Sequence, residues 1–149
     1  MNNEIERKFL VKDFDVEKAK VKYEIKQGYI HAESGKVVRV RTFGDRGYIT
    51  VKYRKTKLTR AEFEYEIPYN DAIDMINNCC DKRVLFKTRY IYNYEGKKWE
   101  IDVFDGKNKG IILAEIELSS EDEEFKIPPF VTKEVTNDPK YSNHNMANK

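Results

Sequence analysis

Apolar and charged side chains alternate along most of this chain, and this period of two is the feature that most limits its fold. Side chains two positions apart on a β-strand lie on the same face, so each such segment has one apolar and one charged face. Short runs such as Gly44-Asp45-Arg46-Gly47 and Glu95-Gly96 separate several segments in the manner of hairpin turns, so a mostly antiparallel sheet is predicted. The predicted strands are Glu4–Val11, Tyr23–His31, Val37–Phe43, Tyr48–Arg54, Ala61–Tyr69, Leu85–Tyr94, Lys98–Phe104 and Ile111–Leu118.

Helices are few in this interpretation. A short helix is predicted at Phe14–Lys22 and a longer one at Asn70–Lys82, where Asn70 can cap the N-terminus. A further short turn is predicted between Ser119 and Phe125, and the tail after residue 133 is polar. The chain is therefore expected to be mainly β, of the α+β class, with a few short helices outside the sheet.

Length and composition suit one domain, predicted to span residues 1–149. Charged residues make up 36% of the chain, yet the net charge of +2 does not favour nucleic acid as a partner. No apolar run approaches the ~20 residues needed to cross a membrane, and the N-terminus lacks a signal-peptide pattern. The two cysteines, Cys79 and Cys80, are adjacent and are interpreted as reduced thiols, so a cytoplasmic location is expected.

The charged faces are sorted by sign from strand to strand. One segment carries Arg39 and Arg41, whereas another carries Glu62, Glu64 and Glu66. On the wet face of an ordinary sheet, such rows would form surface ion pairs worth ~0–1 kcal/mol each. Arginine, which is preferred at several of these positions, binds phosphate bidentately and so favours an anionic ligand. Two explanations stay open here: an open sheet with solvated charges, or a barrel whose charges face inward around a ligand.

The first predicted strand carries Glu4, Glu6 and Lys8 in one row. Paired carboxylates suit a hard divalent cation such as Mg²⁺, which takes oxygen ligands. The nearby ammonium suits an anion held by that metal. In a closed barrel, a metal and a polyanion together would neutralise the acidic and the basic rows.

The segment Glu4-Ile5-Glu6-Arg7-Lys8 resembles the ExExK signature of the CYTH superfamily, the triphosphate tunnel metalloenzymes. Further segments resemble motifs of that family in the same order along nearly the whole chain. They are Gln27-Gly28-Tyr29, Val38-Arg39-Val40-Arg41, Thr50-Val51-Lys52, Glu62-Phe63-Glu64-Tyr65-Glu66-Ile67-Pro68, Lys87-Thr88-Arg89, Glu100-Ile101-Asp102, Ala114-Glu115-Ile116-Glu117-Leu118 and Lys133-Glu134-Val135-Thr136.

This resemblance implies an eight-stranded antiparallel closed β-barrel, a tunnel that binds triphosphate with a divalent metal, Mg²⁺ or Mn²⁺. The compact bacterial members, which this chain resembles in length and in two of these segments, hydrolyse inorganic tripolyphosphate. The implied activity is therefore hydrolysis of a terminal phosphoanhydride that releases orthophosphate. The implied partner is a small-molecule polyanion, with neither nucleic acid nor a membrane involved.

The resemblance also implies roles for particular residues. Metal would be held where the first and last strands meet, by Glu4, Glu6, Glu115 and Glu117. Glu64 or Asp102 would help position a second metal or the attacking water, and Lys8 would contact the phosphate nearest the metal. The implied catalytic residues are Glu4, Glu6, Lys8, Glu64 and Asp102. The phosphates would be bound by Lys8, Arg39, Arg41, Lys52, Lys87, Arg89 and Lys133.

Other functions stay open at this point. A class IV adenylyl cyclase or a thiamine triphosphatase would use the same triphosphate site, and a polyphosphate- or nucleotide-binding module would bind without turnover. A structural β-protein would show no metal-dependent binding. No base-recognition motif is visible, which favours a substrate without a base. The outer apolar face exceeds what two or three short helices can cover, which indicates a homodimer.

Overall fold

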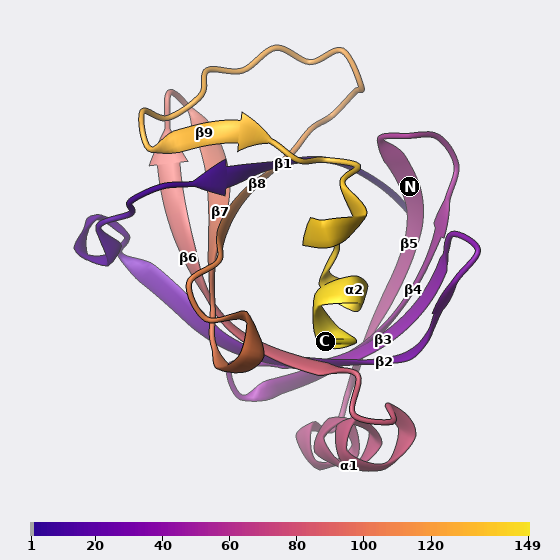
Figure 1. Cartoon of the computed structure of the whole chain (residues 1–149). Helices are drawn as coiled ribbons and strands as arrows, with labels where there is room; N and C mark the ends of the chain where they lie inside the picture. The colour runs from indigo at the N-terminus through magenta and orange to yellow at the C-terminus, as the bar shows by residue number, and fades with distance from the viewer. Residues whose placement is uncertain (1) are drawn as a thin grey trace.

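A computed structural model describes residues 2–149 of the chain and shows one sheet that curls into a closed barrel (Figure 1). The strands follow the order β5-β4-β3-β2-β6-β7-β8-β1, and β1 pairs again with β5 to close the ring, while β9 extends the sheet beyond β1. The predicted eight-stranded antiparallel barrel is therefore confirmed, with one strand more than expected. The strands are β1 (Asn3–Val11), β2 (Val21–Glu33), β3 (Lys36–Phe43), β4 (Arg46–Arg54), β5 (Thr59–Ile67), β6 (Val84–Tyr94), β7 (Lys97–Phe104), β8 (Ile112–Glu117) and β9 (Val131–Glu134).

Strand β1 has three antiparallel partners. Its residues Asn3–Ile5 pair with β5, Glu6–Leu10 with β8, and Phe9 and Val11 with β9. The first strand and the last predicted one thus lie side by side, and the short β1–β5 pairing completes the ring. This arrangement brings the carboxylates of the two strands to one wall, with Glu6 opposite Glu117 in the register.

The helices are shorter than the sequence predicts. Helix α1 (Tyr69–Cys79) has Pro68 at its N-cap, so Asn70 does not cap it, and it ends where Asp81 and Lys82 adopt positive φ. Of the helix predicted at 14–22, only a 3₁₀ turn at Val16–Lys18 is present. The residues after it join β2, because Val21 and its neighbours pair with β6. Two more 3₁₀ turns are Gly106–Asn108 and Pro139–Tyr141.

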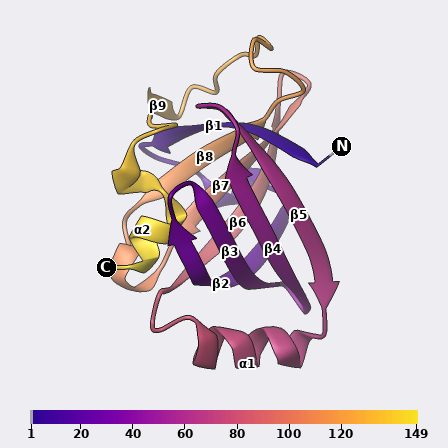
Figure 2. The ribbon, with the colours of Figure 1, turned by 90° about the vertical axis from the view of Figure 1, so that its right-hand side faces the viewer.

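The apolar outer face of the barrel is covered in two places. Helix α1 lies across β3 and β4 (Figure 2), where Ala72 and Ile76 pack on Val40. A Cβ atom on Gly47 would lie 2.8 Å from the Ala72 Cβ, so the absent side chain lets the helix approach this closely. The long connection between β8 and β9 covers a second cluster around Trp99.

Part of that face stays open to solvent on β4 and β5. Val51, Tyr53 and Tyr65 are exposed there, with 64% of Tyr65 accessible. The expected homodimer stays a prediction. No helix in residues 2–149 has the length and apolar character needed to cross a membrane. Cys79 and Cys80 are both free thiols, as predicted.

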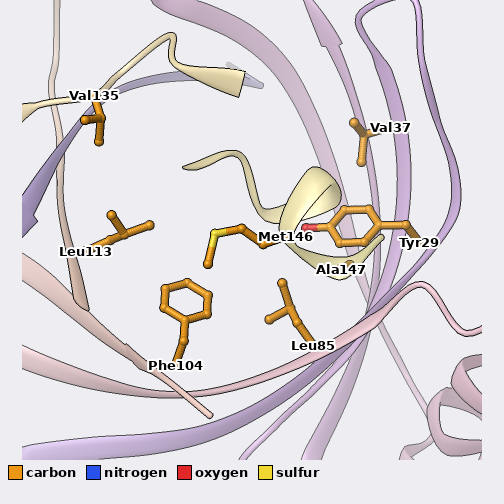
Figure 3. Close-up of a cluster of buried hydrophobic side chains, with 8 residues drawn as sticks. All are labelled: Tyr29, Val37, Leu85, Phe104, Leu113, Val135, Met146 and Ala147. Atoms are coloured by element: carbon orange, nitrogen blue, oxygen red, sulfur yellow. The ribbon is translucent and has the colours of Figure 1, made fainter. Parts of the chain in front are cut away.

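The C-terminal segment enters the barrel, which the sequence interpretation missed. Helix α2 (Asn143–Ala147) lies inside the ring of strands in Figure 1. Its residues Met146 and Ala147 are fully buried and pack with Leu85, Phe104 and Leu113, as Figure 3 shows. One part of the interior is therefore apolar, and the charged side chains line the remainder.

Candidate active site

The charged rows face a shared cavity inside the barrel rather than bulk solvent. The cavity has a volume of about 270 Å³ and is lined by residues from all eight barrel strands. Every strand except β2, which contributes Tyr29, supplies at least one charged side chain. The predicted site residues that line it are Glu4, Glu6, Lys8, Arg39, Arg41, Lys52, Glu64, Lys87, Arg89, Glu115 and Glu117. The enclosed alternative is thus the one that this fold adopts.

Two arginines on β3 form the least neutralised part of the wall. Arg39 and Arg41 each donate to Oε2 of Glu64 at 3.3 Å, and Thr50 donates to the same oxygen at 2.7 Å. The Nε atoms of both arginines are buried and have no hydrogen-bond partner among residues 2–149. Burial lowers the pKa of Arg41, and the charges of Arg39 and Arg89 lower it further. Among the described residues, this wall therefore offers unpaired N–H donors and uncompensated positive charge to an anion.

A buried ion cluster supports the basic pair on β6, Lys87 and Arg89. Asp102 accepts from Arg89 Nε at 2.8 Å and from Arg89 Nη2 at 2.9 Å, and it lies 2.8 Å from Lys87 Nζ. Burial alone would raise the pKa of Asp102, but the charges of Arg89 and Lys87 hold it below its usual value. Asp102 is completely buried and does not line the cavity. It therefore orients the two cations instead of facing a ligand.

The carboxylates expected to bind metal do not form one cluster. Glu4 accepts from Lys52 and Arg60 at 3.0 Å each, which draws it toward the cations. Glu6 and Glu115 are hydrogen-bonded to each other. Burial and the charge of Glu115 raise the pKa of Glu6 well above its usual value, which favours a protonated Glu6 beside Glu115.

Within residues 2–149, no three or more His, Cys, Asp or Glu side chains are arranged as a metal site. The donor set at Glu6 and Glu115 nevertheless fits a hard divalent cation. Two neighbouring carboxylates offer oxygen ligands, and a divalent cation can neutralise the negative charge that otherwise raises the pKa of Glu6. Glu117 lines the same wall, and burial together with the charge of Glu4 raises its pKa.

The structure also places residues that the sequence interpretation did not single out. Arg60 lines the cavity two positions before Glu62, so extending the charged row of β5 by one step would have found it. Tyr141 accepts from Lys8 Nζ through its carbonyl oxygen at 3.0 Å, and Asn143 and His144 reach the cavity from the tail. No periodicity marks these tail residues. The remaining additions to the lining are Tyr29, Val37, Arg54, Lys57, Leu58, Glu62, Glu100, Thr136, Asn137 and Ser142.

Lys133 is placed elsewhere. It is exposed on β9, outside the cavity lining. Strand β9 pairs with the far end of β1, at Phe9 and Val11, beyond the row that faces the cavity. The phosphate contact expected for Lys133 is therefore not supported by its position, and Thr136 is the residue of that segment that reaches the cavity.

A closed antiparallel barrel with facing cationic and carboxylate walls defines a protein that binds a small polyanion in its interior. The sequence model of the CYTH domain matches residues 2–149, and the chain belongs to the CYTH family. It is 46% identical to an inorganic triphosphatase of Acetivibrio thermocellus, over 99% of this chain and 94% of that protein. An inorganic triphosphatase of Nitrosomonas europaea is 36% identical, over 97% of this chain and 96% of that protein.

Solved structures show the same architecture. The crystal structure of an inorganic triphosphatase superimposes with a TM-score of 0.71 at 32% identity, covering 98% of this chain and 95% of the other. A structure described as a putative adenylyl cyclase with a dominant triphosphatase activity, from Hippeastrum, matches with a TM-score of 0.55 at 14% identity, over 78% of this chain and 80% of the other. The latter likeness concerns the fold alone.

Proposed function

We propose that this chain is an inorganic triphosphatase, a hydrolase that removes orthophosphate from tripolyphosphate with the help of Mg²⁺ or Mn²⁺. The observation that carries this proposal is the wall of Arg39 and Arg41, whose buried Nε donors have no partner within residues 2–149, while a carboxylate pair lies on another wall of the same cavity. An extended polyphosphate bridging a metal and a row of guanidinium groups would satisfy both. Two near-full-length relatives named inorganic triphosphatase support the same activity.

The acidic and the basic residues of the cavity have different roles in this proposal. Glu6 and Glu115, with Glu4 and Glu117 beside them, would hold the metal, which polarises phosphoryl oxygens and makes a bound water more nucleophilic. Arg39, Arg41, Lys52, Lys87 and Arg89 bind the phosphate oxygens and offset the charge that develops during phosphoryl transfer. Their positions are preset by the barrel, so little reorganisation is needed when the substrate binds.

Lys8 and Glu64 complete the proposed reaction site. Lys8 lies in the β1 row with Glu6 and opposite Glu115 in the β1–β8 register, so its ammonium suits a phosphate next to the metal. Glu64 is ionised, since Arg41, Thr50 and Arg39 outweigh the effect of burial and lower its pKa. An ionised carboxylate beside the phosphate-binding arginines can orient a water toward the terminal phosphorus.

The lining favours a substrate without a nucleobase. Among the described lining residues, the large apolar or aromatic side chains are Tyr29, Val37 and Leu58, together with the imidazole of His144. Tyr29 is buried, and its hydroxyl accepts from Gln27 at 2.8 Å, so its ring is not a free stacking surface. A nucleotide or thiamine moiety would therefore gain little in this cavity compared with a further phosphate.

Substrate choice can be tested directly. The purified protein should release phosphate from tripolyphosphate with Mg²⁺ or Mn²⁺, with kcat/KM at least about tenfold higher than for ATP, thiamine triphosphate or pyrophosphate, a difference of ~1.4 kcal/mol in transition-state binding. EDTA should abolish release. Formation of cyclic AMP from ATP would instead identify a cyclase, and tight binding without turnover would identify a binding module.

The alkaline limb of activity should reflect Lys87. Burial lowers the pKa of Lys87 to about 8, although Asp102 opposes the shift. As the pH rises through this value, the free protein loses one positive charge from the phosphate site, so KM for tripolyphosphate should rise. Lys87→Arg, which stays charged, should remove that rise in a pH series of KM. An unchanged alkaline limb in this variant would assign it to another group.

A further inference from the structure

The ammonium of Lys87 has two of its three hydrogen-bond donors engaged by protein oxygens. Asp102 Oδ2 lies 2.8 Å from Nζ, and Asn143 Oδ1 lies 3.0 Å from it. Lys87 is 97% buried, and it lines the cavity. Because an ammonium has three N–H groups, one donor is left for a ligand, and the other two contacts decide where it points.

The position of Asn143 is in turn set from a residue that does not reach the cavity. Gln27 Nε2 donates to Asn143 Oδ1 at 3.2 Å and to the Tyr29 hydroxyl at 2.8 Å, and Gln27 is completely buried. An ammonium can only donate, so Asn143 must present its oxygen to Lys87. Gln27 must then present its NH₂ group to that oxygen. The three side chains therefore form one directed chain that leads from β2, through the tail, to β6.

We propose that Gln27 and Asn143 are positioning residues that hold the Lys87 ammonium toward the bound triphosphate. Asp102 attracts this ammonium strongly and also binds Arg89, so without a second acceptor the lysine would turn fully onto the carboxylate. The Asn143 oxygen draws it back toward the cavity. The inference rests on the proposed function only in taking tripolyphosphate as the anion. It also gives a role to the Gln27-Gly28-Tyr29 segment, which the proposed reaction does not use.

A matched residue separates this role from simple anchoring of the tail. Asn108 is also a buried amide, and its Nδ2 donates to the Met146 carbonyl at 3.1 Å, so it holds the same helix α2 at its other end. Asn108 contacts the helix backbone and not the Lys87 ammonium in this network. Loss of Asn108 should loosen the helix without redirecting the lysine.

The test is a double-mutant cycle on tripolyphosphate binding. Gln27→Met keeps the side-chain volume but removes the donor, and it is made in the wild-type and in the Lys87→Met background. Calorimetry with tripolyphosphate and EDTA, which prevents turnover, gives the Kd of each protein. We expect roughly three- to tenfold weaker binding from Gln27→Met in the wild type, the value of one hydrogen bond. In the Lys87→Met background we expect less than a twofold change.

Asn143→Ala in the same two backgrounds should give the same pattern, and it serves if Gln27→Met does not fold. Asn108→Ala should lower the thermal midpoint, and any effect on Kd should be equal in both backgrounds. Equal losses from Gln27→Met and Asn143→Ala in both backgrounds, or no loss in the wild type, would overturn the proposal. Phosphate release by the wild type is measured separately, so an inactive protein with the expected coupling would refute the enzyme assignment and leave the positioning role standing.

Discussion

Replacing Glu6 with glutamine is expected to reduce metal-dependent phosphate release by more than about a hundredfold, beyond the 10- to 100-fold typical of losing an outer partner of a metal ligand. Burial and the neighbouring Glu115 raise the pKa of Glu6, and a glutamine NH₂ group can donate to Glu115 as a protonated Glu6 would. The barrel should therefore stay folded. Glutamine cannot supply the negative charge that a divalent cation requires, so metal binding should fail. Phosphate release over a series of Mg²⁺ concentrations, beside a thermal melt, measures both effects.

The matched control is Glu66→Gln on β5. Glu66 is exposed, pairs with Arg46 at 3.1 Å and lies outside the cavity, so the same chemical change there should leave turnover unaltered. Glu4→Ala would be a poorer test, because it would leave the ammonium of Lys52 and the guanidinium of Arg60 without the carboxylate of Glu4. Near-normal turnover by Glu6→Gln would remove the proposed metal site.

Replacing Asp102 with asparagine should cause the largest loss of stability, about 3–5 kcal/mol in the free energy of unfolding. Asp102 is fully buried between Arg89 and Lys87, and the neutral amide would remove the anion that these two buried cations share. Arg89 would keep the longer contacts with Glu100 at 3.3 Å and Glu115 at 3.4 Å. Urea denaturation monitored by circular dichroism gives the difference. Added tripolyphosphate should restore part of the stability, because a bound polyanion can neutralise the same cations.

Asp74→Asn on the exposed face of α1 is the control for this substitution, and it should change the free energy of unfolding by no more than about 0.5 kcal/mol. If Asp102→Asn unfolds at the same urea concentration as the wild type, the buried ion cluster does not contribute to stability as its geometry implies. If tripolyphosphate stabilises the wild type but not the variant, the cations do not face the ligand.

The strand pattern of this chain was readable from sequence because the alternation is local. Two like charges at alternate positions, such as Arg39 and Arg41, show which face of their strand is polar. The polar faces identified in this way line the same cavity. The turn residues confirm the antiparallel order. Most of the cavity lining follows from these rows once the barrel closes, and the ordered resemblance to a known family supplied the closure.

The rest depends on contacts between distant parts of the chain. Asp102 lies in an acidic row like Glu64, yet the larger neighbours Lys87 and Arg89 cover it, and no single-strand pattern reveals this. The four predicted metal ligands separate because Lys52 and Arg60 draw Glu4 away. Helix α2 is too short and too polar to be predicted from the sequence pattern. Its two apolar residues matter only because the chain turns back into the barrel.

The three partners of β1 have a consequence for how the protein is made. Residues near position 4 pair with residues near 60, then with residues 113–117, and finally with residues 131–134. Pairing residues this far apart in the chain loses conformational entropy before the stabilising contacts form. Folding should therefore be slow relative to helical proteins of this size. During synthesis the part of the amino-terminal strand that pairs with β8 and β9 must stay unpaired until residues 113–134 have left the ribosome.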